Sequence, residues 1–295
     1  MSLGGILPVL QTPFDEEDRI DHAALARFVR FALRSGAAGV VYPANASEFH
    51  VLSARERLEA TEAVCAAADG SAVIISATAA DADGAASYAR KAAELGAQAV
   101  MAIPPRASIA EISDYFLRCA EESRLPVILQ SVVGQVGMTL DDEGLDHLLE
   151  RVPQIAYVKE ERAPTTHMIS SLLTRYDGRL EGVIGGANGQ WLVQETSRGA
   201  CACMPAGALV DLQVPIFEAT RRGDWKRARE LQARLQPLLA YTSIYGVSMV
   251  KEILRMRGLA RNARTRDPAA VSLDEPDRAE LERLLADVPD VPSNG

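Results

Sequence analysis

Primary amines are scarce in this sequence, so chemistry that needs one has few side chains to use. Its basic residues are 27 arginines and four lysines, Lys91, Lys159, Lys226 and Lys251. Lys159 ends the apolar run 155–158, where burial is expected and an ammonium ion is disfavoured. A neutral lysine amine attacks carbonyl carbons and forms Schiff bases. Two interpretations stay open for this residue, a Schiff-base lysine or a buried salt bridge to Glu160, Glu161 or Glu48.

The other lysines lie in stretches with a helical pattern and are expected to be structural, and Lys251 is expected to pair with Glu252. No histidine pair has metal-ligand spacing, and no Gly-x-Ser-x-Gly motif indicates a hydrolase. Cys201 and Cys203 alternate in an apolar run without a histidine nearby. We therefore expect the cysteines to be free thiols in a reducing cytoplasm rather than metal ligands.

Composition excludes several classes of protein. The 295 residues are 48% hydrophobic, which allows a sizeable core and argues against disorder. A net charge of −9 argues against a nucleic-acid-binding face and against binding to an anionic membrane surface. No apolar stretch approaches the ~20 residues of a membrane span, and the N-terminus lacks the pattern of a signal peptide. A cytoplasmic protein is the expectation.

Eight short apolar runs alternate with stretches of helical periodicity. Runs rich in Val and Ile are typical of strands buried on both faces of a parallel sheet. They cover residues 5–10, 39–42, 72–78, 99–103, 126–131, 155–160, 180–186 and 200–205. Helices are predicted over residues 22–35, 53–68, 109–123, 140–152, 165–176 and 190–198. Ser53 and Ser108 open capping-box patterns, and Gly36, Gly96 and Gly199 are placed to close helices in the left-handed conformation.

Eight strand–helix units fit a closed (β/α)8 TIM barrel, an α/β fold, over residues 1–223. An open doubly wound sheet is the alternative, but it often carries a glycine-rich phosphate loop after the first strand. Residues 11–14 are Gln-Thr-Pro-Phe instead. From residue 224 onward helices occur without strands, over 224–241, 248–257 and 275–288, so 224–295 is predicted to be a C-terminal helical extension.

Four segments carry a resemblance that runs along nearly the full chain. They are LPVLQTPF at 7–14, SE at 47–48 with LSARER at 52–57, LPVIL at 125–129, and YVKE at 157–160. In them the sequence resembles the dihydrodipicolinate synthase and N-acetylneuraminate lyase family. The resemblance implies a (β/α)8 barrel with a helical C-terminal extension and a homotetramer. It also implies a Schiff base between the sixth-strand lysine, here Lys159, and a small-molecule 2-oxo acid.

The sequence departs from the family pattern at two conspicuous places. The usual Gly-Thr-Thr-Gly-Glu after the second strand is ANASE at 44–48, and the fifth-strand tyrosine is Gln130. Together with MAIPP at 101–105, these residues resemble the branch of 2-keto-3-deoxy sugar acid dehydratases. That resemblance implies a lyase that dehydrates such an acid to a semialdehyde. Retro-aldol cleavage or condensation with pyruvate, and a 2-oxo acid binding barrel without turnover, stay open as alternatives.

The expected roles follow from the imine and from the position of each residue at a strand end. The catalytic residues are expected to be Lys159, Gln130 and Glu48. The general acid is expected to be Glu48, Glu160 or Glu161, or a substrate-bound water held by Asn45 and Gln130. Substrate contacts are expected from Asn45, Ala46, Ser47, Ser131 and Gly186. The Ala46 and Ser47 N–H groups would hold the substrate carboxylate. The polyol end is assigned to Arg106, Asn188 and Tyr42. The covalent imine on Lys159 replaces a cofactor, and no metal is expected.

Overall fold

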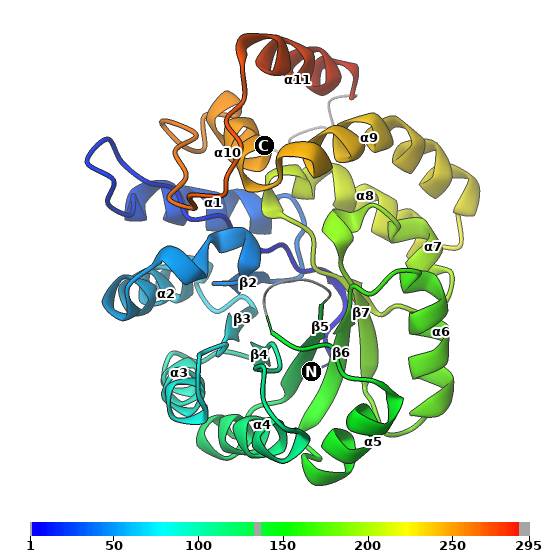
Figure 1. The fold of residues 1–295 in the computed structure, drawn as a ribbon. Helices are drawn as coiled ribbons and strands as arrows, with labels where there is room; N and C mark the ends of the chain where they lie inside the picture. The colour runs from blue at the N-terminus through cyan, green and yellow to red at the C-terminus, as the bar shows by residue number, and fades with distance from the viewer. Residues whose placement is uncertain (1, 133–136, 289–295) are drawn as a thin grey trace.

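The computed structural model describes residues 2–132 and 137–288. In this part of the chain eight parallel strands form one sheet in the order β1-β8-β7-β6-β5-β4-β3-β2. A parallel bridge between Val9 and Val41 joins the two ends of the sheet, which therefore closes into the expected barrel (Figure 1). The strands are β1 (Gly5–Ile6), β2 (Val40–Tyr42), β3 (Val73–Ser76), β4 (Ala99–Ala102), β5 (Val127–Ser131), β6 (Ile155–Glu160), β7 (Gly182–Gly185) and β8 (Ala202–Cys203).

Helices alternate with the strands and surround the barrel (Figure 1). They are α1 (His22–Arg34), α2 (Ala54–Ala68), α3 (Ala82–Glu94), α4 (Ile109–Ser123), α5 (Asp142–Arg151), α6 (Thr165–Arg175), α7 (Leu192–Thr196) and α8 (Val210–Arg221). The capping boxes predicted at Ser53 and Ser108 are both present. Helices α3 and α8 have no counterpart among the predicted ranges, and the internal Pro215 weakens the helical pattern of α8. Sequence periodicity therefore located most of the outer layer.

The glycines predicted to close helices adopt the expected backbone conformation. Gly36, Gly96 and Gly199 have φ values of +90°, +77° and +96°. A residue with a Cβ is strained at such angles, whereas glycine is not. Each of these three turns leads the chain from a helix into the next strand, which confirms the repeated strand–helix unit.

Alternation along the strands separates two apolar layers. The barrel interior is filled by a cluster that includes Val41, Ile74, Met101, Ile128, Tyr157 and Ile184. The residues between them, such as Val40, Leu129 and Val158, belong to the larger cluster between sheet and helices. Successive side chains of a strand point to opposite faces. Lys159, two residues after Tyr157, is therefore placed inside the barrel, and Glu160 outside it.

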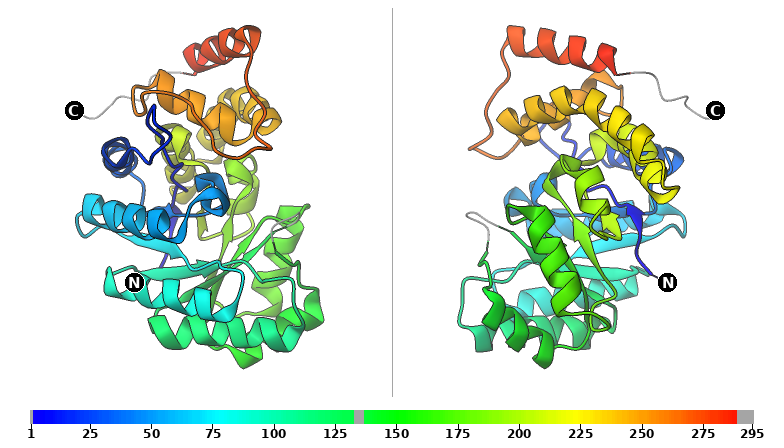
Figure 2. Two further views of the ribbon diagram at one scale, coloured as in Figure 1. Left: turned by 60° about the vertical axis from the view of Figure 1, so that its left-hand side comes forward. Right: turned by 90° about the vertical axis from the view of Figure 1, so that its right-hand side faces the viewer.

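Three helices follow the barrel and form the C-terminal extension, α9 (Trp225–Tyr245), α10 (Val247–Met256) and α11 (Glu275–Asp287). They stack together on the side of the barrel that carries α7 and α8, away from α4 and α5 (Figure 2). Helix α9 continues past its predicted end at residue 241, and Gly246 with φ +55° ends it. The segment Val291–Gly295, which the sequence predicts to be a loose tail, lies outside the described residues. No described helix is long and apolar enough to cross a membrane.

Candidate active site

Lys159 lies on β6 at the end of the barrel where the strands finish. In the sheet register it lies between Gln130 of β5 and Ile184 of β7. Only 4% of its side chain is exposed, which confirms the burial expected from the sequence. The apolar strand β6 thus delivers one primary amine into the barrel.

Glu161 follows β6 and brings a carboxylate to this amine. Its Oε1 lies 3.3 Å from Lys159 Nζ and accepts the N–H of Ala187 at 3.3 Å. Gln130 Nε2 donates to Oε2 at 2.8 Å. Burial acts to raise the pKa of Glu161, but the charge of Lys159 and these hydrogen bonds outweigh it and hold the pKa below its usual value. An ionised carboxylate therefore lies beside the amine, in reach of its proton.

The backbone after β7 is shaped to fit Glu161. A Cβ on Gly186 would lie 2.5 Å from both Cγ and Oε1 of Glu161, so a side chain there would displace the carboxylate. Ala187 and Asn188 follow with φ values of +45° and +55°. Such left-handed conformations cost of order 1 kcal/mol or more for residues other than glycine, and they cluster at functional sites. In this backbone conformation the Ala187 N–H points at the Glu161 carboxylate and donates a hydrogen bond to it.

A cavity of about 370 Å³ lies next to this group, among loops that follow β1, β2, β7 and β8 and against the extension. It is lined by Gln11, Ala46, Ala187, Asn188, Gln190, Ala206, Leu239, Thr242, Ser243, Gly246, Val247 and Val250. Ala187 belongs to the lining and also contacts Glu161. Gln11 is buried, and its Oε1 has no hydrogen-bond partner among the described residues. The lining thus includes amide and hydroxyl side chains, and Ala187 connects the cavity to Glu161, the partner of Lys159.

Another side of this cavity is formed by the 3₁₀ turn η1 (Asn45–Ser47), through Ala46. Ser47 Oγ accepts the N–H of Ala44 at 3.0 Å and donates to the Leu10 carbonyl at 2.5 Å. Thr12 Oγ1 donates to the Ser47 carbonyl at 2.6 Å. These bonds attach one side of the turn to the segment that follows β1.

The match to known proteins covers nearly the whole chain. The sequence profile of the dihydrodipicolinate synthetase family matches residues 2–288. The chain belongs to this family. It is accordingly an enzyme, a lyase or aldolase of the dihydrodipicolinate synthetase family, as the sequence predicted.

Relatives within the family carry more than one activity. L-2-keto-3-deoxyarabonate dehydratase from Azospirillum brasilense is 28% identical over 94% of this chain and 92% of its own. The 4-hydroxy-tetrahydrodipicolinate synthase of Natronomonas pharaonis is 27% identical over 96% and 97%. The crystal structure of dihydrodipicolinate synthase from Rhodopseudomonas palustris superposes with a TM-score of 0.88, at 25% identity and 97% coverage of both chains.

Two of the residues predicted for this family's chemistry do not face Lys159. Ser131 follows Gln130 on β5, so its side chain turns to the outside of the barrel and lines a small cleft with Leu129 and Val158. Glu48, one of the candidates for the general acid, is buried in an ion pair with Lys251 of the extension. The expectation that Lys251 pairs with Glu252 is wrong, because the Lys251 ammonium pairs with Glu48 instead.

The η1 turn also differs in detail from the expectation. The N–H of Ser47 is used within the turn, where it donates to the Ala44 carbonyl at 2.8 Å. It is therefore not free to hold a carboxylate. The Asn45 side chain is exposed, and Ala46 is the residue of this turn that lines the cavity. The substrate roles of Asn45 and Ala46 stay predictions.

The three residues assigned to the polyol end lie in different places. Asn188 lines the cavity. Arg106 lines a separate groove between α2, α3 and α4. Tyr42 is fully buried, and its hydroxyl lies 3.0 Å from Thr12 Oγ1. Among the described residues no group of three or more His, Cys, Asp or Glu side chains is placed to hold a metal ion, and the four cysteines are free thiols.

Sequence reasoning missed a buried acid on the outer face of β7. Glu195 of α7 is 1% exposed, and neither carboxylate oxygen has a hydrogen-bond partner in the described ranges. Burial raises the pKa of Glu195 to about 7, the nearby Thr165 hydroxyl acts to lower it, and the Glu161 and Glu160 charges add to the rise. The short α7 gave no periodic signal for this burial.

We expect Glu195 to make the stability of the fold depend on pH. A pKa raised on folding stabilises the folded state fully below the unfolded value, about pH 4.5, and this contribution is lost as the pH rises through about 7. The stability of the wild type should therefore fall, relative to Glu195→Gln, by up to about 3 kcal/mol between pH 4.5 and pH 8. Urea unfolding of both proteins at several pH values measures this, and parallel curves would refute it.

Proposed function

We propose that this enzyme forms an imine between Lys159 and the C2 carbonyl of a 2-oxo acid, and that it dehydrates a 2-keto-3-deoxy sugar acid. The observation that carries the proposal is the buried amine of Lys159 with the Glu161 carboxylate 3.3 Å away, which Ala187 connects to a cavity that is lined in part by amides and hydroxyls. A lysine in this setting is a nucleophile once its proton is removed. The dehydratase from Azospirillum brasilense, similar over most of its length, supports this substrate class.

The reaction is assembled from the amine. Glu161 accepts a proton from the Lys159 ammonium, and the neutral amine attacks C2. The carbonyl oxygen leaves as water, and a protonated imine remains. The C3 proton then passes to a base, and the electron pair of that bond forms an enamine. The enamine expels the C4 hydroxyl, which takes up a proton and leaves as water. The protonated imine accepts the electron pair of the broken C3–H bond, so neither a cofactor nor a metal is given a role in this reaction.

The product follows from the same atoms. In a five-carbon acid, proton shifts from the C5 carbon and hydroxyl to C3 and C4 convert the conjugated imine to an aldehyde. Hydrolysis then frees the 2-oxo acid semialdehyde and restores the Lys159 amine. The sum is the loss of one water from the substrate.

Glu161 is the group we assign to proton transfer. The other two candidates have partners elsewhere, because Glu160 lies 2.7 Å from the Arg162 guanidinium and Glu48 pairs with Lys251. Glu161 is ionised at neutral pH, since its pKa is held below its usual value, so a lone pair is available to accept the proton. Once it has accepted a proton, the same carboxyl group is able to return it to the departing C4 hydroxyl. Gln130, which stands where the family usually has tyrosine, orients Glu161 through its hydrogen bond.

The product distinguishes this proposal from its alternatives. Incubation with L-2-keto-3-deoxyarabonate is expected to yield one semialdehyde for each substrate consumed and no pyruvate. Formation of pyruvate together with an aldehyde would show that the enzyme catalyses retro-aldol cleavage and not dehydration. A thermal shift with the sugar acid and no product would favour a binding barrel without turnover.

The cavity should select for the polyol tail. Ser243 of α9 lines it, so Ser243→Phe is expected to fill the space and raise KM for the sugar acid about tenfold or more. Imine trapping with pyruvate, which has no tail, should stay unchanged. Ile244→Phe is the matched control, because Ile244 is 64% exposed and is not part of the lining. Equal KM values in the two variants would place the tail elsewhere.

A further inference from the structure

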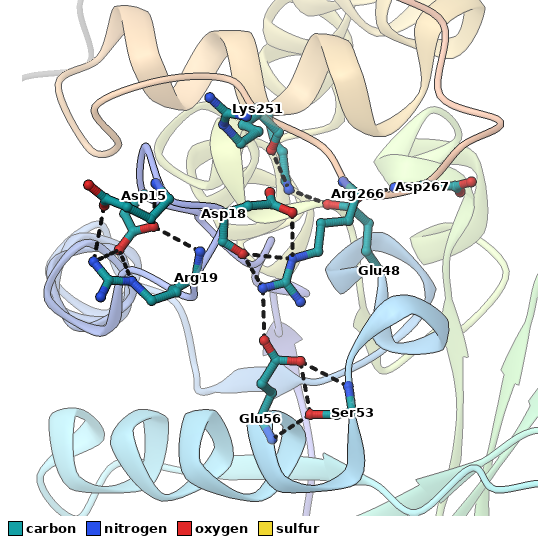
Figure 3. Close-up of polar contacts among 11 residues, drawn as sticks. Asp15, Asp18, Arg19, Glu48, Ser53, Glu56, Lys251, Arg266 and Asp267 are labelled. Carbon is teal, nitrogen blue, oxygen red and sulfur yellow. Dashed lines mark hydrogen bonds and ion pairs between the residues drawn. The ribbon is translucent and has the colours of Figure 1, made fainter.

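A buried ion pair connects the C-terminal extension to the loop after β2 (Figure 3). Lys251 of α10 and Glu48 have side chains that are 3% and 1% exposed. Glu48 Oε1 also accepts the backbone N–H groups of Arg266 and Asp267, at 2.8 Å and 3.1 Å. The carboxylate is therefore held by one side chain and two backbone groups, all of them from the extension.

Glu48 is also a point of strain in the backbone. It separates η1 from a second 3₁₀ turn, η2 (Phe49–Val51), and has a left-handed φ of +58°. Such a conformation in a residue with a side chain costs of order 1 kcal/mol or more and persists where surrounding contacts fix it. The side-chain contacts of Glu48 all come from the extension, so the extension helps to hold this bend.

The loop between α10 and α11 fixes the neighbouring segments as well. The Arg266 guanidinium lies 2.8 Å from Glu56 Oε1, at the start of α2, and donates to the Asp18 carbonyl (Figure 3). Lys251 Nζ donates to the Arg264 carbonyl at 2.8 Å. The Phe14 ring lies 4.1 Å from Lys251 Nζ and 4.3 Å from the Arg266 guanidinium.

Stability alone is a weak reason for such a cluster. Burial lowers the pKa of Lys251 to about 8 although Glu48 acts to raise it, so the ammonium is kept at a cost in free energy. A buried ion pair often adds little stability compared with apolar residues of similar size. A buried ion pair does fix the geometry of the segments that it joins. Here it fixes Glu48, the residue that directly follows η1.

We propose that Lys251 is a positioning residue, which acts through Glu48 to hold the η1 turn as a wall of the substrate cavity. The inference rests on the proposed imine chemistry and deepens it. Ser47 attaches η1 to the segment after β1, and Glu48 attaches it to the extension. Ala46, which lines the cavity, lies between these two attachments. The extension thus sets how closely the turn approaches the C1–C2 end of a bound 2-oxo acid.

The test follows the rate of borohydride trapping as the pyruvate concentration is varied. Hydride reduces the imine to a secondary amine, so the rate saturates with the fraction of enzyme present as imine. Lys251→Met is expected to raise the half-saturating pyruvate concentration by about tenfold to a hundredfold. The maximal trapping rate, which reports Lys159 itself, should change little. Lys251→Arg keeps the charge and should recover part of the loss.

Arg255→Met is the matched control on the same helix. Arg255 pairs with Glu252 and is 43% exposed, so its loss should leave the half-saturating concentration at the wild-type value. A folded Lys251→Met that also retains the wild-type value would overturn the inference. If wild-type enzyme gave no adduct at any concentration, the proposed function would fail instead.

A second variant covers the case in which Lys251→Met does not fold because Glu48 is left as a buried, unpaired charge. The double variant Glu48→Gln/Lys251→Met removes both charges, and the introduced amide retains an oxygen that can accept the Arg266 and Asp267 N–H groups. It is expected to show the same rise in half-saturating concentration. If all the variants at these two positions lost the fold, the cluster would be purely structural and the inference would be overturned.

Discussion

Replacing Lys159 by alanine is expected to abolish turnover, with kcat/KM falling by at least about 10⁴-fold. The imine cannot form without the amine, and no other lysine among the described residues contacts Glu161. The fold should survive, because Glu161 is 23% exposed and keeps its hydrogen bonds from Gln130 and Ala187 when Lys159 is lost. Steady-state rates with the sugar acid, together with circular dichroism, measure the two effects.

Lys91→Ala is the control for this change. Lys91 lies on α3 and pairs with Glu62, with 31% of its side chain exposed. It should retain wild-type rates. Substantial turnover in Lys159→Ala would mean that the reaction does not pass through an imine on this residue.

Replacing Glu161 by glutamine should lower kcat by about 10² to 10⁴-fold, the usual contribution of general acid–base catalysis. An amide next to Lys159 cannot take the ammonium proton or return one to the leaving hydroxyl. The hydrogen bond from the Gln130 amide can still reach the remaining carbonyl oxygen, so substrate binding should change less than kcat. Separate determination of kcat and KM for the sugar acid measures this.

Glu218→Gln provides a comparison in which a carboxylate is removed far from the amine. Glu218 lies on α8 and is 50% exposed, 3.8 Å from Arg222. Its loss should leave kcat unchanged. If the kcat of Glu161→Gln equalled that of Glu218→Gln, Glu161 would serve only as the counter-ion of Lys159. Another residue would then have to be the acid–base group.

Much of the barrel was predictable because its physical causes are local. Val- and Ile-rich runs, capping boxes and glycines with positive φ each act within a few residues. The burial of Lys159 was predictable for the same reason, since an apolar strand ending in a charged residue carries that residue into the interior. The inward direction of Gln130 and the outward direction of Ser131 also follow from alternation, which the sequence-based assignment of Ser131 did not apply.

The partners of the charged residues were not predictable from local pattern. The direction of Glu48 depends on a left-handed backbone conformation and on Lys251, which lies on a helix of the extension. Glu161 was one of three acids available to Lys159 in the sequence. The choice among them depends on Gln130 and Ala187, which the closed barrel brings from β5 and the loop after β7. Contacts between residues so far apart in the sequence form only in the tertiary fold.

The central claim, an imine on Lys159, is tested most directly by borohydride trapping with pyruvate followed by peptide mapping. The account predicts one reduced adduct, on the peptide that contains Lys159, and none in Lys159→Ala. An adduct on Lys251 or another lysine, or no adduct at saturating pyruvate, would contradict it.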